Sequence, residues 1–164
     1  MIEVRRIRSD EAAAYREVRL AALEDSPAAF ASTRDIESAY ESEVWEQRTR
    51  RAASGPQSAL FLAMDDRPVG MVGVLQNASD ETTAELVSMW VAPSGRRRGV
   101  GAALVGRAVA WADESGYRRV EPWVTRGNES AERLYRRLGF AVTREVKPLP
   151  SDPCKDETRM RLEL

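Results

Sequence analysis

The chain of 164 residues contains no histidine and only one cysteine, Cys154. The absence of histidine excludes a Ser-His-Asp or Cys-His nucleophilic pair and a His-ligated metal site, and we expect no metal. Any general base must therefore be a carboxylate, a tyrosine, a lysine, a backbone group or a water molecule. A single cysteine excludes an internal disulfide and fits the reducing cytoplasm, where we expect the protein to lie.

Long apolar runs and an excess of one charge are also missing. No run of about 18 or more apolar residues is present, so we expect no membrane span. Residues 1–8 alternate apolar and charged side chains, which is typical of a strand and not of a signal peptide. The 25 basic and 26 acidic residues give a net charge of −1, which argues against nucleic acid as a partner. The length favours a single domain over residues 1–164.

Hydrophobic periodicity and turn residues predict strands and helices that alternate along the chain. The expected strands are 2–8, 59–63, 69–75, 84–91, 120–125, 140–147 and 157–164. Helices are expected over about 9–25, around Trp45, from the glycine-rich segment to about residue 114, and over 128–138; 28–37 and 148–156 are expected to be loops. Strands 84–91 and 120–125 flank a helix and should be parallel through a right-handed crossover, while short turns make the other pairs antiparallel. The expected fold is therefore α+β, with one mixed sheet of about seven strands and helices on both faces.

The most informative segment joins strand 84–91 to the long helix that follows it, and reads Val-Ala-Pro-Ser-Gly-Arg-Arg-Arg-Gly-Val-Gly-Ala over residues 91–102. Free N–H groups and the helix dipole at such a junction bind phosphate, and Gly99 and Gly101 would let a bulky anion approach the main chain. A dinucleotide-binding fold fits poorly, because Leu104 stands where a third glycine or alanine is needed and only one crossover is evident. A P-loop is excluded, because no Gly-Lys-Ser/Thr follows.

Two motifs together resemble those of the GNAT acetyltransferase superfamily. Arg96-x-x-Gly99-x-Gly101, after a Val-x-Pro strand end, resembles the family's acetyl-CoA signature. Residues 128–140, Asn-Glu-Ser-Ala-Glu-Arg-Leu-Tyr-Arg-Arg-Leu-Gly-Phe, are similar to its Asn-x-x-Ala…Leu-Tyr-x-x-x-Gly-Phe element. The resemblance covers nearly the whole chain in element order, and it implies the GNAT fold with acetyl-CoA as co-substrate.

The resemblance also implies which residues meet the co-substrate. The backbone amides that would hold the pyrophosphate are those of Arg96, Arg97, Arg98, Gly99, Val100, Gly101 and Ala102. Met89 and Val91 would bind the pantetheine arm through their main chains where strands 84–91 and 120–125 splay apart, and Pro122 agrees with that splay. Asn128 would meet the cofactor or a bound water. The alternatives are a solvated basic turn for the three arginines and a helix N-cap for Asn128.

Two residues are the catalytic candidates. Tyr135 resembles the family's general acid, because a phenol can protonate the departing thiolate; the alternative is a place in the apolar stripe of its helix. Glu85 lies eleven residues before Arg96, the spacing at which histone-type members place a base glutamate. The alternatives for Glu85 are a solvated charge at the strand edge or a water molecule as the base. Trp90 is expected in the core, facing away from the side of Glu85 and Met89.

The sequence therefore predicts an N-acetyltransferase that moves an acetyl group from acetyl-CoA directly to a primary amine in a ternary complex. A small-molecule amine is favoured, and a protein N-terminus or lysine is the alternative acceptor; a homodimer is left open. A non-catalytic protein that senses acyl-CoA is the rival of a different class. By analogy with the family, the acceptor pocket would be lined by residues 26–34, the helix with Trp45, strand 84–91, Trp123 and residues 148–156.

Overall fold

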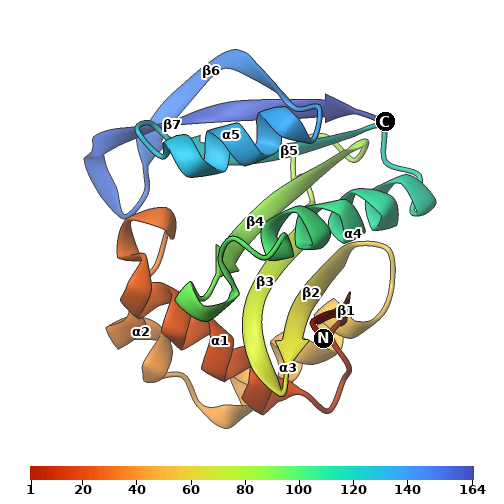
Figure 1. The fold of residues 1–164 in the computed structure, drawn as a ribbon, viewed down its shortest axis with the longest axis vertical. Coiled ribbons are helices and arrows are strands. Elements are labelled where there is room, and N and C mark those ends of the chain that lie inside the picture. Colours follow the sequence, from red (N-terminus) through yellow and green to blue (C-terminus); the bar gives the residue numbers. More distant parts are fainter.

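The computed structural model describes residues 1–164 and contains one seven-stranded mixed sheet (Figure 1). The strands are β1 (Glu3–Arg6), β2 (Ser58–Asp65), β3 (Arg67–Gln76), β4 (Thr83–Val91), β5 (Arg119–Thr125), β6 (Ala141–Leu149) and β7 (Asp152–Glu163). The helices are α1 (Ala12–Asp25), α2 (Arg34–Ser38), α3 (Ser42–Ala53), α4 (Val100–Glu114) and α5 (Glu129–Arg137), with short 3-10 turns η1 (Pro27–Ala29) and η2 (Pro93–Gly95). The order across the sheet is β1-β2-β3-β4-β5-β7-β6, and only β4 and β5 are parallel. The predicted fold class and crossover are confirmed.

Two segments that were expected to be loops contain regular structure. Helix α2 lies at the end of the expected loop 28–37, and it begins where the Thr33 hydroxyl accepts a hydrogen bond from the Ile36 N–H group. The expected loop 148–156 belongs largely to the β6–β7 hairpin, in which Pro148 pairs with Asp156. Strand β6 is an edge strand, and an edge strand tolerates a proline because its outer side needs no N–H donor.

Helices cover both faces of the sheet, as predicted, and each face carries its own hydrophobic cluster. Alternation along β2 sends Phe61 to the face covered by α4 and Leu62 to the face covered by α1 and α3. No helix in the structure is both long and apolar enough to cross a bilayer.

Strands β4 and β5 separate in the middle of the sheet. Their ladder joins residues 83–86 to residues 119–122 and ends at the pair Leu86–Pro122. Pro122 has no N–H group to extend the ladder, and from Trp123 onward β5 pairs only with β7. In Figure 1, β4 runs on toward α1 while β5, β6 and β7 stay together. The predicted splay is confirmed, and it leaves one side of β4 without a strand partner.

A β-bulge at Ser88 interrupts β4 inside this opening. Ser88 has a positive φ of 56°, and the register against β3 shifts there, from Val87 opposite Gly73 to Trp90 opposite Met71. An extra residue in one strand reverses the alternation of the side chains beyond it. Met89 therefore packs on the α4 face, whereas Trp90 is buried on the α1 face. The predicted core role of Trp90 is confirmed, but the expectation that it faces away from the side of Glu85 is wrong, because the bulge returns it to that side.

Candidate active site

The loop between β4 and α4 presents a row of free backbone donors. The amides of residues 97–102 make no hydrogen bond within the chain, since the last loop amides that do are those of Gly95 and Arg96. Gly99, at the N-cap of α4, has a φ of 75°, which a residue without a Cβ adopts without strain. Free N–H groups and the positive end of the helix dipole together attract an anion.

A cavity of about 730 Å³ lies in front of these amides. Its lining residues are Val91, Gly95, Arg96, Arg97, Gly99, Val100, Gly101, Ala102, Ser130, Leu134, Arg137 and Leu138. A Cβ on Gly101 would lie 3.2 Å from Leu134 Cδ2 and 3.3 Å from Met89 Cε, so a larger residue would crowd these two side chains. The four residues from Ser130 onward were not predicted to be site residues, although they lie inside the 128–140 motif. The signal that could have found them is that motif itself, which contains all four.

The three consecutive arginines of the loop have different partners. Arg96 donates from Nε to the Val91 carbonyl at 3.0 Å and forms an ion pair with Asp25. Arg98 forms an ion pair with Asp65 at 3.2 Å and does not line the cavity. Arg97 makes neither a hydrogen bond nor an ion pair, and the same holds for Arg137 across the cavity. The guanidinium groups available for a phosphate are therefore those of Arg97 and Arg137, while Arg96 ties the loop to the end of α1.

Tyr135 lies on α5 at the open side of the β4–β5 wedge. It is 4% exposed, and its ring packs edge-on against Phe140 at a centroid distance of 5.3 Å, so it does belong to the apolar stripe. Its hydroxyl makes no hydrogen bond within the chain, and burial raises the pKa of the phenol far above its ordinary value of 10. Tyr135 also lines a cavity of about 80 Å³ with Met89 and Asn128. The residue can thus pack the core and offer a protonated hydroxyl to that cavity.

Asn128 is the N-cap of α5, because its Oδ1 accepts a hydrogen bond from the Ala131 N–H group at 3.2 Å. The capping alternative is therefore present in the structure. Asn128 also lines the Tyr135 cavity, so capping and contact with a ligand there are compatible.

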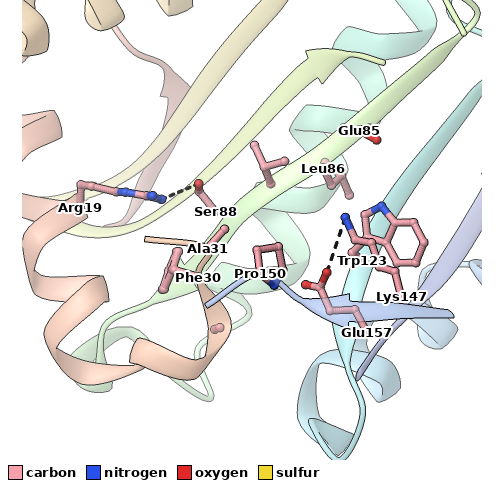
Figure 2. Close-up of a pocket in the computed structure, with 12 residues that line it drawn as sticks. Arg19, Phe30, Ala31, Glu85, Leu86, Ser88, Trp123, Lys147, Pro150 and Glu157 are labelled. Atoms are coloured by element: carbon pink, nitrogen blue, oxygen red, sulfur yellow. Dashed lines mark hydrogen bonds and ion pairs between the residues drawn. The ribbon is translucent and has the colours of Figure 1, made fainter. Parts of the chain in front are cut away.

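A third cavity, of about 230 Å³, opens on the α1 face of the wedge (Figure 2). Its lining residues are Arg19, Ala29, Phe30, Ala31, Glu85, Leu86, Val87, Ser88, Trp123, Lys147, Pro150 and Glu157. Nine of the twelve lie in the segments expected around an acceptor pocket, whereas Arg19, Lys147 and Glu157 lie outside those segments. Trp45 was expected there, but it is 2% exposed and packs against Tyr15 in the core, because α3 lies behind α1.

The three cavities follow one another along the wedge. The two smaller ones share Leu86, Val87, Ser88 and Trp123 as walls. Strand β4 then leads from Met89 in the Tyr135 cavity to Val91 in the large one. Strand β4 therefore contributes a wall to all three cavities, from the one at the free amides of α4, through the one beside Tyr135, to the pocket of Figure 2.

Glu85 lines the pocket of Figure 2 but has partners of its own. One carboxylate oxygen accepts a hydrogen bond from Asn77 Nδ2 at 2.7 Å and lies 3.8 Å from Arg159 Nη2. The side chain of Glu85 is 22% exposed. The alternative of a freely solvated charge is therefore wrong, because the turn after β3 and strand β7 both contact this carboxylate.

A buried ion pair holds the bulge from the α1 side. Arg19 donates to both carboxylate oxygens of Glu37, from Nε at 3.0 Å and from Nη2 at 2.9 Å. Its remaining nitrogen, Nη1, donates to Ser88 Oγ at 2.6 Å, a contact drawn in Figure 2. The guanidinium also lies over the Phe30 ring, 4.9 Å from its centroid. This ion pair was not predicted, because neither Arg19 nor Glu37 belongs to a sequence motif and the two meet only through the packing of α1 on α2.

The splayed sheet, the loop of free amides and the glycine-lined cavity together form an arrangement that can accommodate a phosphorylated ligand. Residues 16–140 match the model of the Acetyltransferase (GNAT) family, and this is more than half of the chain. The chain therefore belongs to the GNAT acetyltransferase family.

Relatives and solved structures agree with this membership. An uncharacterized N-acetyltransferase of Methanocaldococcus jannaschii is 36% identical over 88 residues, which are 51% of this chain and 39% of that protein. The match thus spans about two fifths of the length of that relative. An acetyltransferase of the GNAT family from Streptococcus pneumoniae has a TM-score of 0.84 at 21% identity, with all of both chains covered. The PaiA N-acetyltransferase from Thermoplasma acidophilum, solved in complex with coenzyme A, has a TM-score of 0.78 at 20% identity over 100% of this chain and 99% of that one. At these identities the structures show a shared fold.

Proposed function

We propose that this chain transfers an acetyl group from acetyl-CoA to a primary amine, directly and within a ternary complex. The observation that carries the proposal is that β4 lines three cavities in turn, from the one at the free amides of residues 97–102 to the pocket of Figure 2. A pyrophosphate fits the first cavity, because it meets unpaired N–H donors and two unpaired guanidinium groups there. The solved neighbour in complex with coenzyme A supports the same ligand class.

Each part of the path has a role in this proposal. The amides of Arg97 to Ala102 bind the pyrophosphate, and the side chains of Arg97 and Arg137 neutralise its charge. Beyond Leu86, β4 has no partner on the β5 side, so the backbone around Met89 can bind the pantetheine amides and the thioester carbonyl. The Val91 carbonyl is already bound by Arg96, which leaves Met89 as the main contact of this strand.

Tyr135 is the proposed general acid. Burial keeps its phenol protonated, so its hydroxyl can donate to the sulfur atom as the thiolate departs. Amine attack requires an uncharged nitrogen, and the pocket of Figure 2 supplies two carboxylates that can remove a proton, Glu85 and Glu157. The sequence predicts Glu85 as the base, no observation tests that prediction, and Glu157 is the second candidate that the pocket offers.

A small-molecule amine is the proposed acceptor. The acceptor pocket of about 230 Å³ lies below the range of about 300–1,000 Å³ that drug-sized ligands occupy. A peptide could insert only its terminal residue there, so a protein N-terminus is the second acceptor to test.

The direct test is release of free thiol from acetyl-CoA with a panel of small primary amines and short peptides. Thiol release that depends on an amine supports the enzyme, whereas binding of acetyl-CoA without turnover supports a sensor. Gly101→Asp provides the matched binding control, because its carboxylate would enter the glycine-walled cavity and repel a pyrophosphate. We expect the affinity for coenzyme A, measured by calorimetry, to collapse in a folded Gly101→Asp variant; an unchanged affinity would contradict the proposed site.

A further inference from the structure

The two carboxylates of the acceptor pocket differ in how fully they are bound by the protein. Glu85 accepts a hydrogen bond from Asn77, whose own Oδ1 accepts from the N–H groups of Ser79 and Asp80. The turn that follows β3 therefore holds the Glu85 carboxylate in place. Arg159 ties it further to a network with Glu121 and Glu145.

Glu157 has much weaker contacts. Its side chain is 12% exposed, and its contact with a charged group is a long one. The nearest cation is Lys147 Nζ at 3.7 Å, which also lies 4.4 Å from the centre of the Trp123 ring. Figure 2 shows Glu157 and Lys147 side by side next to Trp123, with the ion pair drawn as a dashed line.

The Glu157 carboxylate is partly buried and keeps most of its hydrogen-bonding capacity for a donor from outside the chain. A carboxylate in a pocket normally accepts several hydrogen bonds. Burial raises the pKa of Glu157 above its ordinary value, and the charge of Lys147 offsets this only in part. A substrate ammonium carries three N–H donors and a positive charge, so it supplies what Glu157 lacks.

We propose that Glu157 is the residue that binds the primary ammonium group of the acceptor and takes its proton. This inference rests on the proposed acetyltransferase function and identifies the substrate as a primary amine that reaches the pocket in its charged form. The charged groups that surround Glu157 across the pocket are Lys147 from β6, Arg19 from α1 and Glu85 from β4, with Arg159 from β7 against Trp123.

The step balances without any further reactant. One proton passes from the ammonium to the Glu157 carboxylate and frees the lone pair of the nitrogen. The nitrogen forms a bond to the thioester carbonyl carbon, the carbon–sulfur bond breaks, and the sulfur takes the Tyr135 hydroxyl proton. The nitrogen loses its second proton to water, which restores Tyr135, and Glu157 releases its proton to solvent. The net products are the acetylated amine, the free thiol and one proton.

The test compares two isosteric variants of the full-length protein, Glu157→Gln and Glu85→Gln, using an amine that the panel shows to be a substrate. For each variant, kcat/KM for the amine is measured across pH, and the Kd of coenzyme A is measured by calorimetry. We expect Glu157→Gln to lower kcat/KM by about 10²-fold at neutral pH, as for loss of a general base. It should also replace the acidic limb of the wild-type profile by a rise at higher pH that follows the pKa of the amine, because only the uncharged amine can then react. The Kd of coenzyme A should not change, since Glu157 is remote from the α4 amides.

Glu85→Gln is the matched control, and it should keep the acidic limb. Loss of the limb in Glu85→Gln and its retention in Glu157→Gln would overturn the assignment in favour of Glu85. Retention of the limb in both variants would overturn it in favour of water. A wild-type protein that binds coenzyme A and releases no thiol with any amine would instead overturn the proposed function and this inference with it. Glu157→Asp guards against a folding defect, because it keeps the charge and should retain the acidic limb at a reduced rate.

Discussion

Replacement of Glu37 by glutamine tests the buried ion pair that supports the bulge in β4. Glu37 is 1% exposed, and both of its carboxylate oxygens accept hydrogen bonds from Arg19; Arg48 approaches one of them at 3.5 Å. Glutamine keeps the shape of the side chain and removes its charge. The Arg19 guanidinium, whose side chain is 12% exposed, would then remain buried without an anionic partner.

The size of the loss follows from the burial of both partners. Removing one partner of a buried pair typically costs about 3–5 kcal/mol. The contact of Arg19 with the Phe30 ring is kept in the variant. We therefore expect the free energy of unfolding to fall by about 3 kcal/mol, the lower end of that range. For a protein of this size each kcal/mol lowers Tm by roughly 2–4 °C, so Tm should fall by roughly 6–12 °C. Thermal unfolding followed by circular dichroism measures this.

Glu17→Gln is the matched control for that measurement. Glu17 also accepts two hydrogen bonds from one arginine, Arg67, but both side chains are exposed. An exposed pair contributes about 0–1 kcal/mol, so the control should lose much less stability. A Tm loss in Glu37→Gln no larger than that in Glu17→Gln would refute the burial argument.

Activity provides a second measurement on the same variant. Arg19 also holds Ser88, the residue with the positive φ at the bulge. We expect kcat of folded Glu37→Gln to fall at a temperature well below its Tm, while the Kd of coenzyme A is unchanged. A fall in stability without any change in kcat would show that the pair supports the fold alone.

The parts of the fold and site that the sequence predicted well depend on local chemistry. Gly99 takes a positive φ at the N-cap of α4, and Asn128 caps α5 with its own side chain. Pro122 ends the β4–β5 ladder because it lacks an N–H group. Each of these outcomes is decided by residues within a few positions, so a single sequence carries enough information to predict them.

The errors arise where distant residues decide the structure. A serine at position 88 gives no sign of a bulge, yet that bulge reverses the side-chain alternation and moves Trp90 to the other face. Arg96 and Arg97 look equivalent in the motif, but Asp25, 71 residues away, engages only Arg96. Such pairings follow from how α1 packs against the sheet, which local patterns do not encode.

The acceptor pocket also contains a residue whose role the local sequence does not indicate. Glu157 was assigned to a strand that begins there, and nothing in its neighbourhood marks it as functional. The β5–β7 ladder pairs it with Thr125, and the β6–β7 hairpin pairs it with Lys147. Only this double pairing brings its carboxylate to the pocket that also contains Glu85. The acceptor pocket is therefore assembled by strand pairing between distant residues, whereas the loop between β4 and α4 is formed by a local sequence motif.

Three further measurements test the site and the fold. Tyr135→Phe should keep Tm and lower kcat by about 10²-fold, because it removes only the hydroxyl; loss of stability with unchanged activity per folded molecule would assign Tyr135 to the core alone. Arg137→Gln should weaken coenzyme A binding in a salt-dependent way, whereas Arg136→Gln should not, because Arg136 is ion-paired on the outside of α5.

The last measurement is stability against pH. Burial by itself raises the pKa of Glu37, but the hydrogen bonds and charge of Arg19 prevail and hold it below the ordinary value of 4.5. A carboxyl group with a lowered pKa contributes stability that is present above its unfolded pKa and is lost as pH falls through its folded pKa. The wild-type protein should therefore lose stability below about pH 4.5 more steeply than Glu37→Gln, which has no such group to protonate, and urea unfolding at several pH values measures the difference. Parallel curves for the two proteins would mean that this pair does not contribute to acid unfolding.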